Sequence, residues 1–347
     1  MIRILLLLVG LVFFQPITAQ ISTHELPIST TRPLPAQQLK KIPLVMLPDI
    51  NRAALKSADD KDEQEGLPPR FGKDFTVNYN LDNSGVWHTY PNGDRIWQLT
   101  VVASGAKSIN FLYNDFHLPH GAKFFIYNQD KSHVLGAFMA RNNKVDRRFA
   151  TGLVYGDQVT LEYYEPAKVA RQGVININKI VHGYRYISLP ADYQKGFGDS
   201  GSCNVNTVCQ QGDEWRKELK GVALMILNGT RWCSGSLINN TDEDDKLYFL
   251  TANHCLSNFD AVTNPVASAF SFYWRYESPD CGYNVSDGAT NLSTTGATII
   301  ANSGNPGNVQ ASDFALLELV EDPVAEGYDV YFNGFDATNT ATTSVTS

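Results

Sequence analysis

The chain has 347 residues, of which 43% are hydrophobic and 18% are charged, and its formal net charge is −8. Residues 198–347 hold 6 Lys/Arg against 19 Asp/Glu, a net of −13, so residues 1–197 carry +5. The acidic second part disfavours nucleic acid as a partner, and no run after residue 19 approaches the ~18 apolar residues that a membrane-spanning helix requires.

The first predicted element is a signal peptide over residues 1–19. Arg3 gives it a charged beginning, residues 4–14 are almost all apolar, and small residues end it at Thr18-Ala19. This pattern is typical of a leader that is removed on export rather than of a membrane anchor. We therefore expect a secreted or periplasmic protein with no membrane contact after cleavage.

Residues 20–70 are predicted to be a largely extended pro-region. Seven prolines lie between residues 21 and 70, and a strongly charged run occupies residues 59–65. Such a stretch has little of the periodic apolar pattern that helices and strands need.

Residues 71–168 are predicted to form an antiparallel β-sandwich, and residues 169–197 a linker. Short apolar runs recur in the first of these regions and are separated by turn signals such as Pro91-Asn-Gly93, a pattern typical of an all-β fold. The strands are expected at 86–90, 95–102, 108–113, 123–127 and 158–164. Their aromatic side chains are interpreted as core and cross-strand packing rather than as a carbohydrate-binding platform.

The strongest functional signal is the segment Tyr248-Phe-Leu-Thr-Ala-Asn-His254-Cys255. An apolar run ends there in a turn that presents His254, the single histidine of residues 198–347, and Cys233 lies 22 positions before Cys255. A serine protease needs a general base whose imidazole is held in a fixed orientation, and a disulfide beside it would restrict the loop. A lone histidine is more often structural, but the flanking cysteine and the spacing favour the catalytic role.

Three segments together resemble the trypsin-like serine endopeptidases. They are Cys233-Ser-Gly-Ser-Leu-Ile, Phe249-Leu-Thr-Ala-Asn-His254-Cys255 and Ser312-Asp313-Phe-Ala-Leu-Leu. Gly198-Asp-Ser-Gly-Ser-Cys203, followed by Cys209, is similar to the mature beginning of the bacterial lysyl endopeptidases. The resemblance covers about residues 198–347.

The resemblance implies an all-β fold with the first barrel of a double-barrel protease following the β-sandwich. It implies hydrolysis of protein or peptide substrates by a Ser/His/Asp triad, with His254 as the base and Asp313 as the carboxylate, and no cofactor. The alternative for Asp313 is a solvated residue at the entry of a strand. Lys195 would be a processing site if the mature enzyme cuts after lysine, and is otherwise an exposed loop residue.

The resemblance also implies how the five cysteines are used. It pairs Cys233 with Cys255 and Cys209 with Cys281, and leaves Cys203 unpaired because its partner lies in the second barrel. A local Cys203–Cys209 bridge that leaves Cys281 free is the alternative. No metal site is expected, because zinc favours paired cysteine spacings and more histidine, and the pair His117 and His120 has no accompanying cysteine or carboxylate cluster.

One member of the triad is missing from the printed sequence. The family's nucleophile lies in a Gly-x-Ser-Gly segment well downstream of the aspartate, and no such motif follows Asp313. Ser200, in Gly198-Asp-Ser-Gly, precedes His254 by 54 residues, whereas the family's chain order is His, Asp, Ser, so it is interpreted as a decoy. The chain is therefore expected to be an enzyme cut short, inactive by itself.

Three hypotheses follow from the sequence. The first is the precursor of a secreted endopeptidase, whose basic pro-segment docks on the acidic protease part. The second is a shortened, inactive protease-like protein that binds partners through its β-sandwich. The third is a secreted adhesion module with a vestigial protease half. Retention of His254 and Asp313 in good local sequence favours the first.

Overall fold

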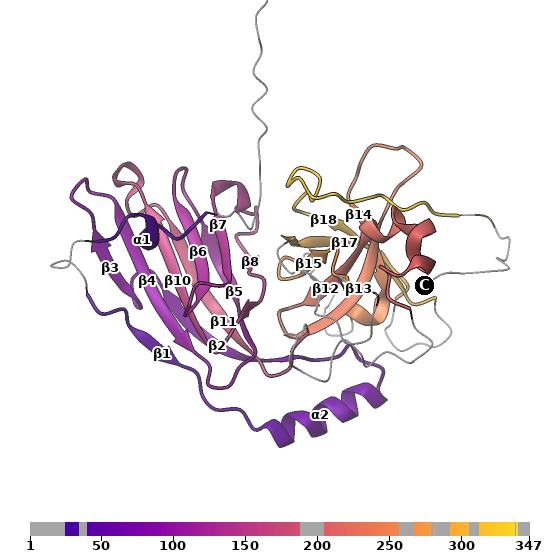
Figure 1. The fold of residues 1–347 in the computed structure, drawn as a ribbon, viewed down its shortest axis with the longest axis horizontal. Coiled ribbons are helices and arrows are strands. Elements are labelled where there is room, and N and C mark those ends of the chain that lie inside the picture. The colour runs from indigo at the N-terminus through magenta and orange to yellow at the C-terminus, as the bar shows by residue number, and fades with distance from the viewer. Residues whose placement is uncertain are drawn as a thin grey trace, which may run out of the picture.

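The structure is a computed structural model that describes residues 25–34, 40–187, 205–256, 267–278, 281, 292–304, 312–336 and 338. The predicted signal peptide, Lys195, Ser200 and Cys203 lie outside these residues. Strands dominate the described part and form three sheets (Figure 1), so the predicted all-β fold is confirmed. No helix in the described ranges is long and apolar enough to cross a membrane.

Two sheets enclose a common core in residues 40–187, which we call the sandwich unit. Apart from the parallel pair of β1 and β4, neighbouring strands in these sheets are antiparallel. Side chains from both sheets, such as Trp97 and Phe111, are fully buried in one cluster between them. The first sheet contains β1 (Leu44–Met46), β3 (Val86–Thr89), β4 (Arg95–Val102), β6 (Lys123–Asn128), β7 (Val134–Phe138) and β10 (Gln158–Glu165). The second contains β2 (Gly72–Asn80), β5 (Ser108–His117), β8 (Phe149–Ala150), β9 (Val154–Tyr155) and β11 (Val174–Gly183).

The predicted linker over 169–197 is wrong where β11 (Val174–Gly183) lies. This strand pairs with β2 on one side and β5 on the other, so it is a central strand of the second sheet. Ile175 and Ile177 are buried and alternate with polar asparagines. That alternation of period two is the mark of a strand that faces a core on one side.

The predicted extended pro-region over 20–70 is wrong where α2 (Arg52–Gln64) lies. The side chain of Asn51 accepts a hydrogen bond from the Ala54 N–H at 3.0 Å, which caps the first turn. Lys56 and Asp60 form an ion pair one turn apart. The prolines of this region lie on either side of the helix and not within it, so they delimit α2 rather than prevent it. A shorter helix, α1 (Ile28–Thr31), precedes it.

Residues 205–336 contain one seven-stranded antiparallel sheet, which we call the seven-stranded unit. Its strand order is β16-β15-β12-β13-β14-β18-β17. The edge strands β16 and β17 are joined in the chain through Gly296 alone, so the sheet curls until its edges meet. Phe249, Phe272 and Leu317 are fully buried in its core. The strands are β12 (Val222–Leu227), β13 (Arg231–Ile238), β14 (Tyr248–Ala252), β15 (Ser271–Trp274), β16 (Ser293–Thr295), β17 (Ala297–Asn302) and β18 (Phe314–Leu319).

Five short 3₁₀ turns complete the described elements. They are η2 (Ala140–Asn142), η3 (Ala167–Val169), η4 (Gln210–Trp215), η5 (Glu218–Gly221) and η6 (Asn253–Leu256). Of these, η6 continues β14 and carries His254.

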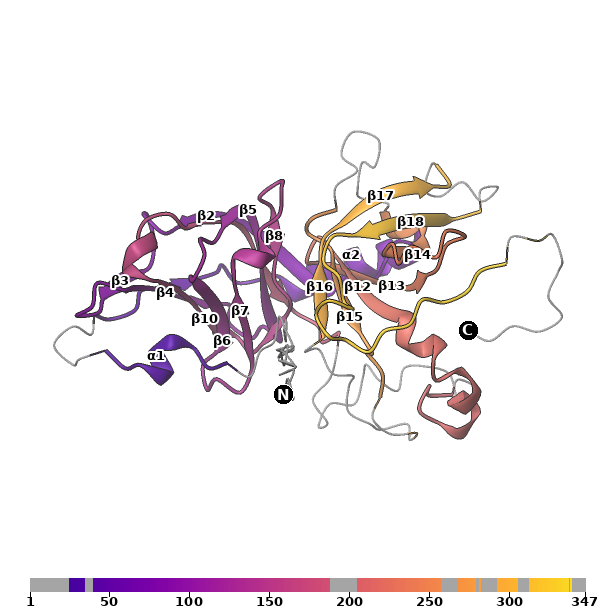
Figure 2. The same cartoon turned by 90° about the horizontal axis from the view of Figure 1, so that it is seen from above.

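The two units lie side by side (Figures 1 and 2). The turn between β12 and β13 contacts the sandwich unit, where Asn110 Nδ2 donates to the Gly229 carbonyl at 3.3 Å. The Phe71 N–H donates to the Thr230 carbonyl at 2.9 Å, and the Phe71 ring packs against Trp232 with ring centroids 6.0 Å apart. Asp62 of α2 accepts hydrogen bonds from Arg70 and from Arg231, so one carboxylate bridges both units.

His133 makes the stability of the sandwich unit sensitive to acid. Its Nδ1 accepts the Tyr155 N–H at 3.2 Å and the two rings stack, while burial lowers the pKa of His133 from 6.5 to about 4. Because the pKa is lower in the folded state, the buried neutral ring contributes fully to the free energy of unfolding above pH 6.5. This contribution is lost as the pH falls toward 4. The contribution is at most about 3 kcal/mol.

We expect His133→Asn, whose side-chain oxygen can accept the same N–H, to abolish this acid-dependent part. Urea unfolding at several pH values between 7 and 4 measures it. The wild-type free energy of unfolding should fall more steeply with acid than that of the variant, and parallel curves would contradict the prediction.

Candidate active site

His254 is positioned by the strand that precedes it. β14 pairs with β13 on one side and β18 on the other, and Phe249 anchors it in the core. Thr251 Oγ1 donates to the Ser234 carbonyl at 2.8 Å and fixes the end of the strand. The chain then turns into η6, which leaves the His254 ring partly exposed beyond the end of β14.

A disulfide holds the other side of this turn. Cys255 is bonded to Cys233 of β13, with their α-carbons 6.2 Å apart, within the usual range for a disulfide. Cys255 is buried, so the residue next to His254 is fixed both by packing and by a covalent bond.

This disulfide also excludes a metal site at the turn. Cys233, His254 and Cys255 form the single group of three potential metal-binding side chains found within the described ranges. Metal coordination by cysteine requires a free thiolate, and here the two sulfur atoms are bonded to each other. The disulfide therefore restricts the position of His254, and the group is not a metal centre.

Asp313 contacts His254 twice. Its Oδ2 lies 2.7 Å from His254 Nδ1, and its Oδ1 accepts the His254 backbone N–H at 2.8 Å. The Asp313 carbonyl also accepts the Asn253 N–H at 3.1 Å. Asp313 comes just before β18 and has a φ of +43°, a conformation that aspartate tolerates better than most residues. The geometry places it against the histidine and not in solvent on the far side of the sheet.

The electrostatics keep Asp313 ionised. Burial alone would raise its pKa, but hydrogen bonds from the His254 ring and backbone, and the His254 charge, outweigh it and lower the pKa below the ordinary value. An ionised carboxylate at Nδ1 favours the tautomer with a proton on Nδ1, which leaves the Nε2 lone pair free to accept a proton.

Asn253 is a site residue that the sequence analysis missed. It is buried, and its Nδ2 donates to the Gly304 carbonyl at 2.6 Å while its backbone N–H is held by Asp313. It therefore fixes the turn to the segment after β17. Its position directly before His254 was the available signal.

The second disulfide joins Cys209 to Cys281, 72 residues apart, with α-carbons separated by 4.8 Å. The alternative Cys203–Cys209 bridge is therefore wrong, because Cys209 already has a partner. Cys203, which is predicted to be unpaired, lies outside the described residues, as do Lys195 and Ser200. Two disulfides are typical of proteins in an oxidising compartment outside the cytoplasm.

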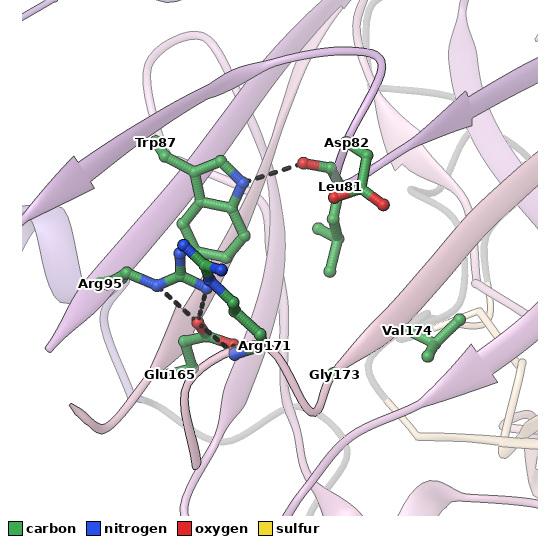
Figure 3. A pocket seen from close by; sticks show the side chains of 8 residues that line it. All are labelled: Leu81, Asp82, Trp87, Arg95, Glu165, Arg171, Gly173 and Val174. Carbon is green, nitrogen blue, oxygen red and sulfur yellow. Dashed lines mark hydrogen bonds and ion pairs between the residues drawn. The ribbon is translucent and has the colours of Figure 1, made fainter. Parts of the chain in front are cut away.

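The sandwich unit contains a hollow of about 560 Å³ beside Trp87 (Figure 3). The Arg95 guanidinium lies 4.1 Å from the centre of the Trp87 ring and its Nε donates to Glu165 at 2.7 Å. The Arg171 N–H donates to the same carboxylate, and the Trp87 indole N–H to the Leu81 carbonyl. These polar groups satisfy one another and an arginine covers the indole, so the hollow lacks the open aromatic face of a carbohydrate platform.

Comparison with known proteins agrees with this geometry. Residues 197–347 match the family model described as "Lysyl endopeptidase, C-terminal domain". The chain is also 26% identical over 274 residues to the lysyl endopeptidase of Pseudomonas aeruginosa. The chain is lysyl endopeptidase-like.

The similarity of this lysyl endopeptidase-like chain is not confined to the part that carries His254. The alignment to the Pseudomonas protein covers 75% of the chain, which is more than residues 197–347 provide, so it extends into the sandwich unit. The chain spans 56% of the length of that relative.

Proposed function

We propose that this chain is part of a secreted serine endopeptidase precursor in which His254 is the general base and Asp313 orients it. The observation that carries the proposal is the double contact of Asp313 with the His254 ring and backbone, at 2.7 and 2.8 Å. In this scheme His254 Nε2 takes the proton of a serine hydroxyl as it attacks the peptide carbonyl. Asp313 then stabilises the imidazolium, which later gives the proton to the leaving amine.

We further propose that polypeptide outside residues 1–347 supplies the serine and the oxyanion hole. The printed sequence has no Gly-x-Ser-Gly segment after Asp313, and the chain spans only 56% of its relative. Leu250 and Phe314, on the strands that carry the two site residues, expose large apolar side chains. Such side chains beside an active site suit a surface that a second barrel covers.

For the substrate we propose protein chains cleaved after lysine, since the relative is named a lysyl endopeptidase. The sandwich unit is proposed to act as a pro-segment that docks on the seven-stranded unit. Its support is the set of contacts made by Phe71 with Thr230 and Trp232 and by Asp62 with Arg231.

A fluorophosphonate probe, which reacts with activated serines, tests the proposal. The secreted product of the gene should be labelled and should cleave a lysine-containing peptide, and His254→Ala should lose both properties, because the serine is no longer activated. The 347-residue chain alone should remain unlabelled. Labelling of that chain that disappears in Ser200→Ala would overturn the assignment of the nucleophile. A secreted product with intact His254 and Asp313 that cleaves no peptide would favour a protease-like binding protein.

A further inference from the structure

A lysine of the sandwich unit is buried where the two units meet, between the Phe149 ring of its own unit and the seven-stranded unit. Lys144, on the loop between η2 and β8, is 9% exposed. Its Nζ donates to Thr295 Oγ1 at 2.7 Å and to the Ser268 carbonyl at 3.3 Å, and both acceptors belong to the other unit. Lysine is almost never this buried unless its charge is matched, so the receiving site needs an explanation.

A glycine lies directly against the ammonium in the receiving site. Gly296, next to Thr295, has a φ of +86°, and a β-carbon at this position would lie 2.7 Å from Lys144 Nζ. A side chain at position 296 would therefore force the ammonium of Lys144 to shift.

The site also has a buried carboxyl group. Glu321, just after β18, accepts the Thr295 N–H at 2.7 Å with Oε2, while its Oε1 is buried without a hydrogen-bond partner in the described part of the chain. Burial lowers the pKa of Lys144 and raises the pKa of Glu321, and the charge of each residue opposes the effect of burial on the other. Asp146, on the same loop as Lys144, accepts the Ser268 hydroxyl and adds a second polar contact between the units.

We propose that Ser268, Thr295, Gly296 and Glu321 form a binding pocket for a primary alkylammonium, which Lys144 occupies to lock the sandwich unit in place. The pocket is distinct from the His254–Asp313 site, because Asp313 and Glu321 lie at opposite ends of β18, roughly 25 Å apart along an extended strand. The seven-stranded unit thus recognises the sandwich unit through a lysine side chain. The pocket does not depend on the proposed catalytic role.

Chemical rescue tests the pocket in the 347-residue chain. Lys144→Ala removes three methylenes and the ammonium, which n-propylammonium replaces atom for atom. The variant should melt several degrees below the wild type, because it leaves buried acceptors without a donor. n-Propylammonium should restore the melting temperature with a dissociation constant on the order of 1 mM. n-Propanol and equimolar sodium chloride should not restore it.

Two matched variants sharpen the result. Lys168→Ala removes an exposed lysine of the same unit, so its melting temperature should not respond to the amine. Adding Glu321→Gln to Lys144→Ala should weaken the rescue by roughly 10-fold. Equal responses of the Lys144 and Lys168 variants, or rescue by n-propanol as well as by the amine, would overturn the proposal.

A measurement on the wild-type chain covers the case in which Lys144→Ala does not fold. Acetylation by acetic anhydride, read by peptide mass spectrometry, should modify Lys144 roughly 100-fold more slowly than Lys168, because its ammonium is accessible only after the units separate. Similar rates at the two lysines would contradict the pocket.

Discussion

Asp313→Asn is expected to lower kcat of the active protease by about 10⁴-fold, the loss seen when a triad aspartate becomes an amide. The change leaves the shape of the side chain and its contact with the His254 backbone nearly intact. The amide, however, can donate to His254 Nδ1 and so favours the tautomer whose Nε2 carries the proton. That tautomer cannot accept a proton from the serine. Steady-state kinetics on a lysyl peptide measures the loss.

Asp242→Asn is the matched control for this experiment. Asp242 lies in an exposed loop and its carboxylate makes no hydrogen bond that the described residues supply, so its kcat should remain near that of the wild type. A loss of less than about 10-fold in Asp313→Asn would remove Asp313 from the proposed triad, although the fold would stand.

Removing the Cys233–Cys255 disulfide by a double alanine substitution is expected to cost about 3 kcal/mol of stability. Chain entropy gives this value for a closed loop of 22 residues. The activity should fall further than the stability explains, because the bond holds the residue next to His254. Urea unfolding gives the free energy, and kcat measured well below the melting temperature gives the effect on the site.

The Cys209–Cys281 disulfide is the natural control. It closes a loop of 72 residues, so its removal should cost more stability, about 4 kcal/mol, but it has no contact with His254. A stability ranking opposite to the loop lengths would show that native-state strain outweighs chain entropy. Equal loss of kcat in the two variants would deny the Cys233–Cys255 bond its proposed role of positioning the histidine.

The candidate site was predictable from sequence because each part has a local signature. The apolar runs before His254 and after Asp313 predict two strands, and the structure pairs these as β14 and β18, with Ala252 opposite Phe314. This pairing brings together residues that are 59 positions apart. The φ of +43° at Asp313 had no sequence signal, because aspartate occurs in many backbone conformations.

The misplaced elements show where local patterns fail. In β11 the asparagines between the buried isoleucines lower the apolar content of the segment, so it does not stand out as an apolar run. The prolines on both sides of α2 favour an extended segment, although the residues between them are mostly good helix formers. The Lys144 pocket could not be predicted at all, since Lys144 and Thr295 are 151 residues apart and their contact depends on how the two units meet.

Lys217, Lys220 and Lys246 are the three lysines of residues 198–347, and all of them lie between Cys209 and Cys281. Lys246 also lies between Cys233 and Cys255. A protease that cuts after lysine would therefore meet each of its own cleavable bonds in this region inside a covalently closed ring. A single autolytic cut would nick the molecule without shedding a fragment, and the damage would be visible on a gel only after reduction.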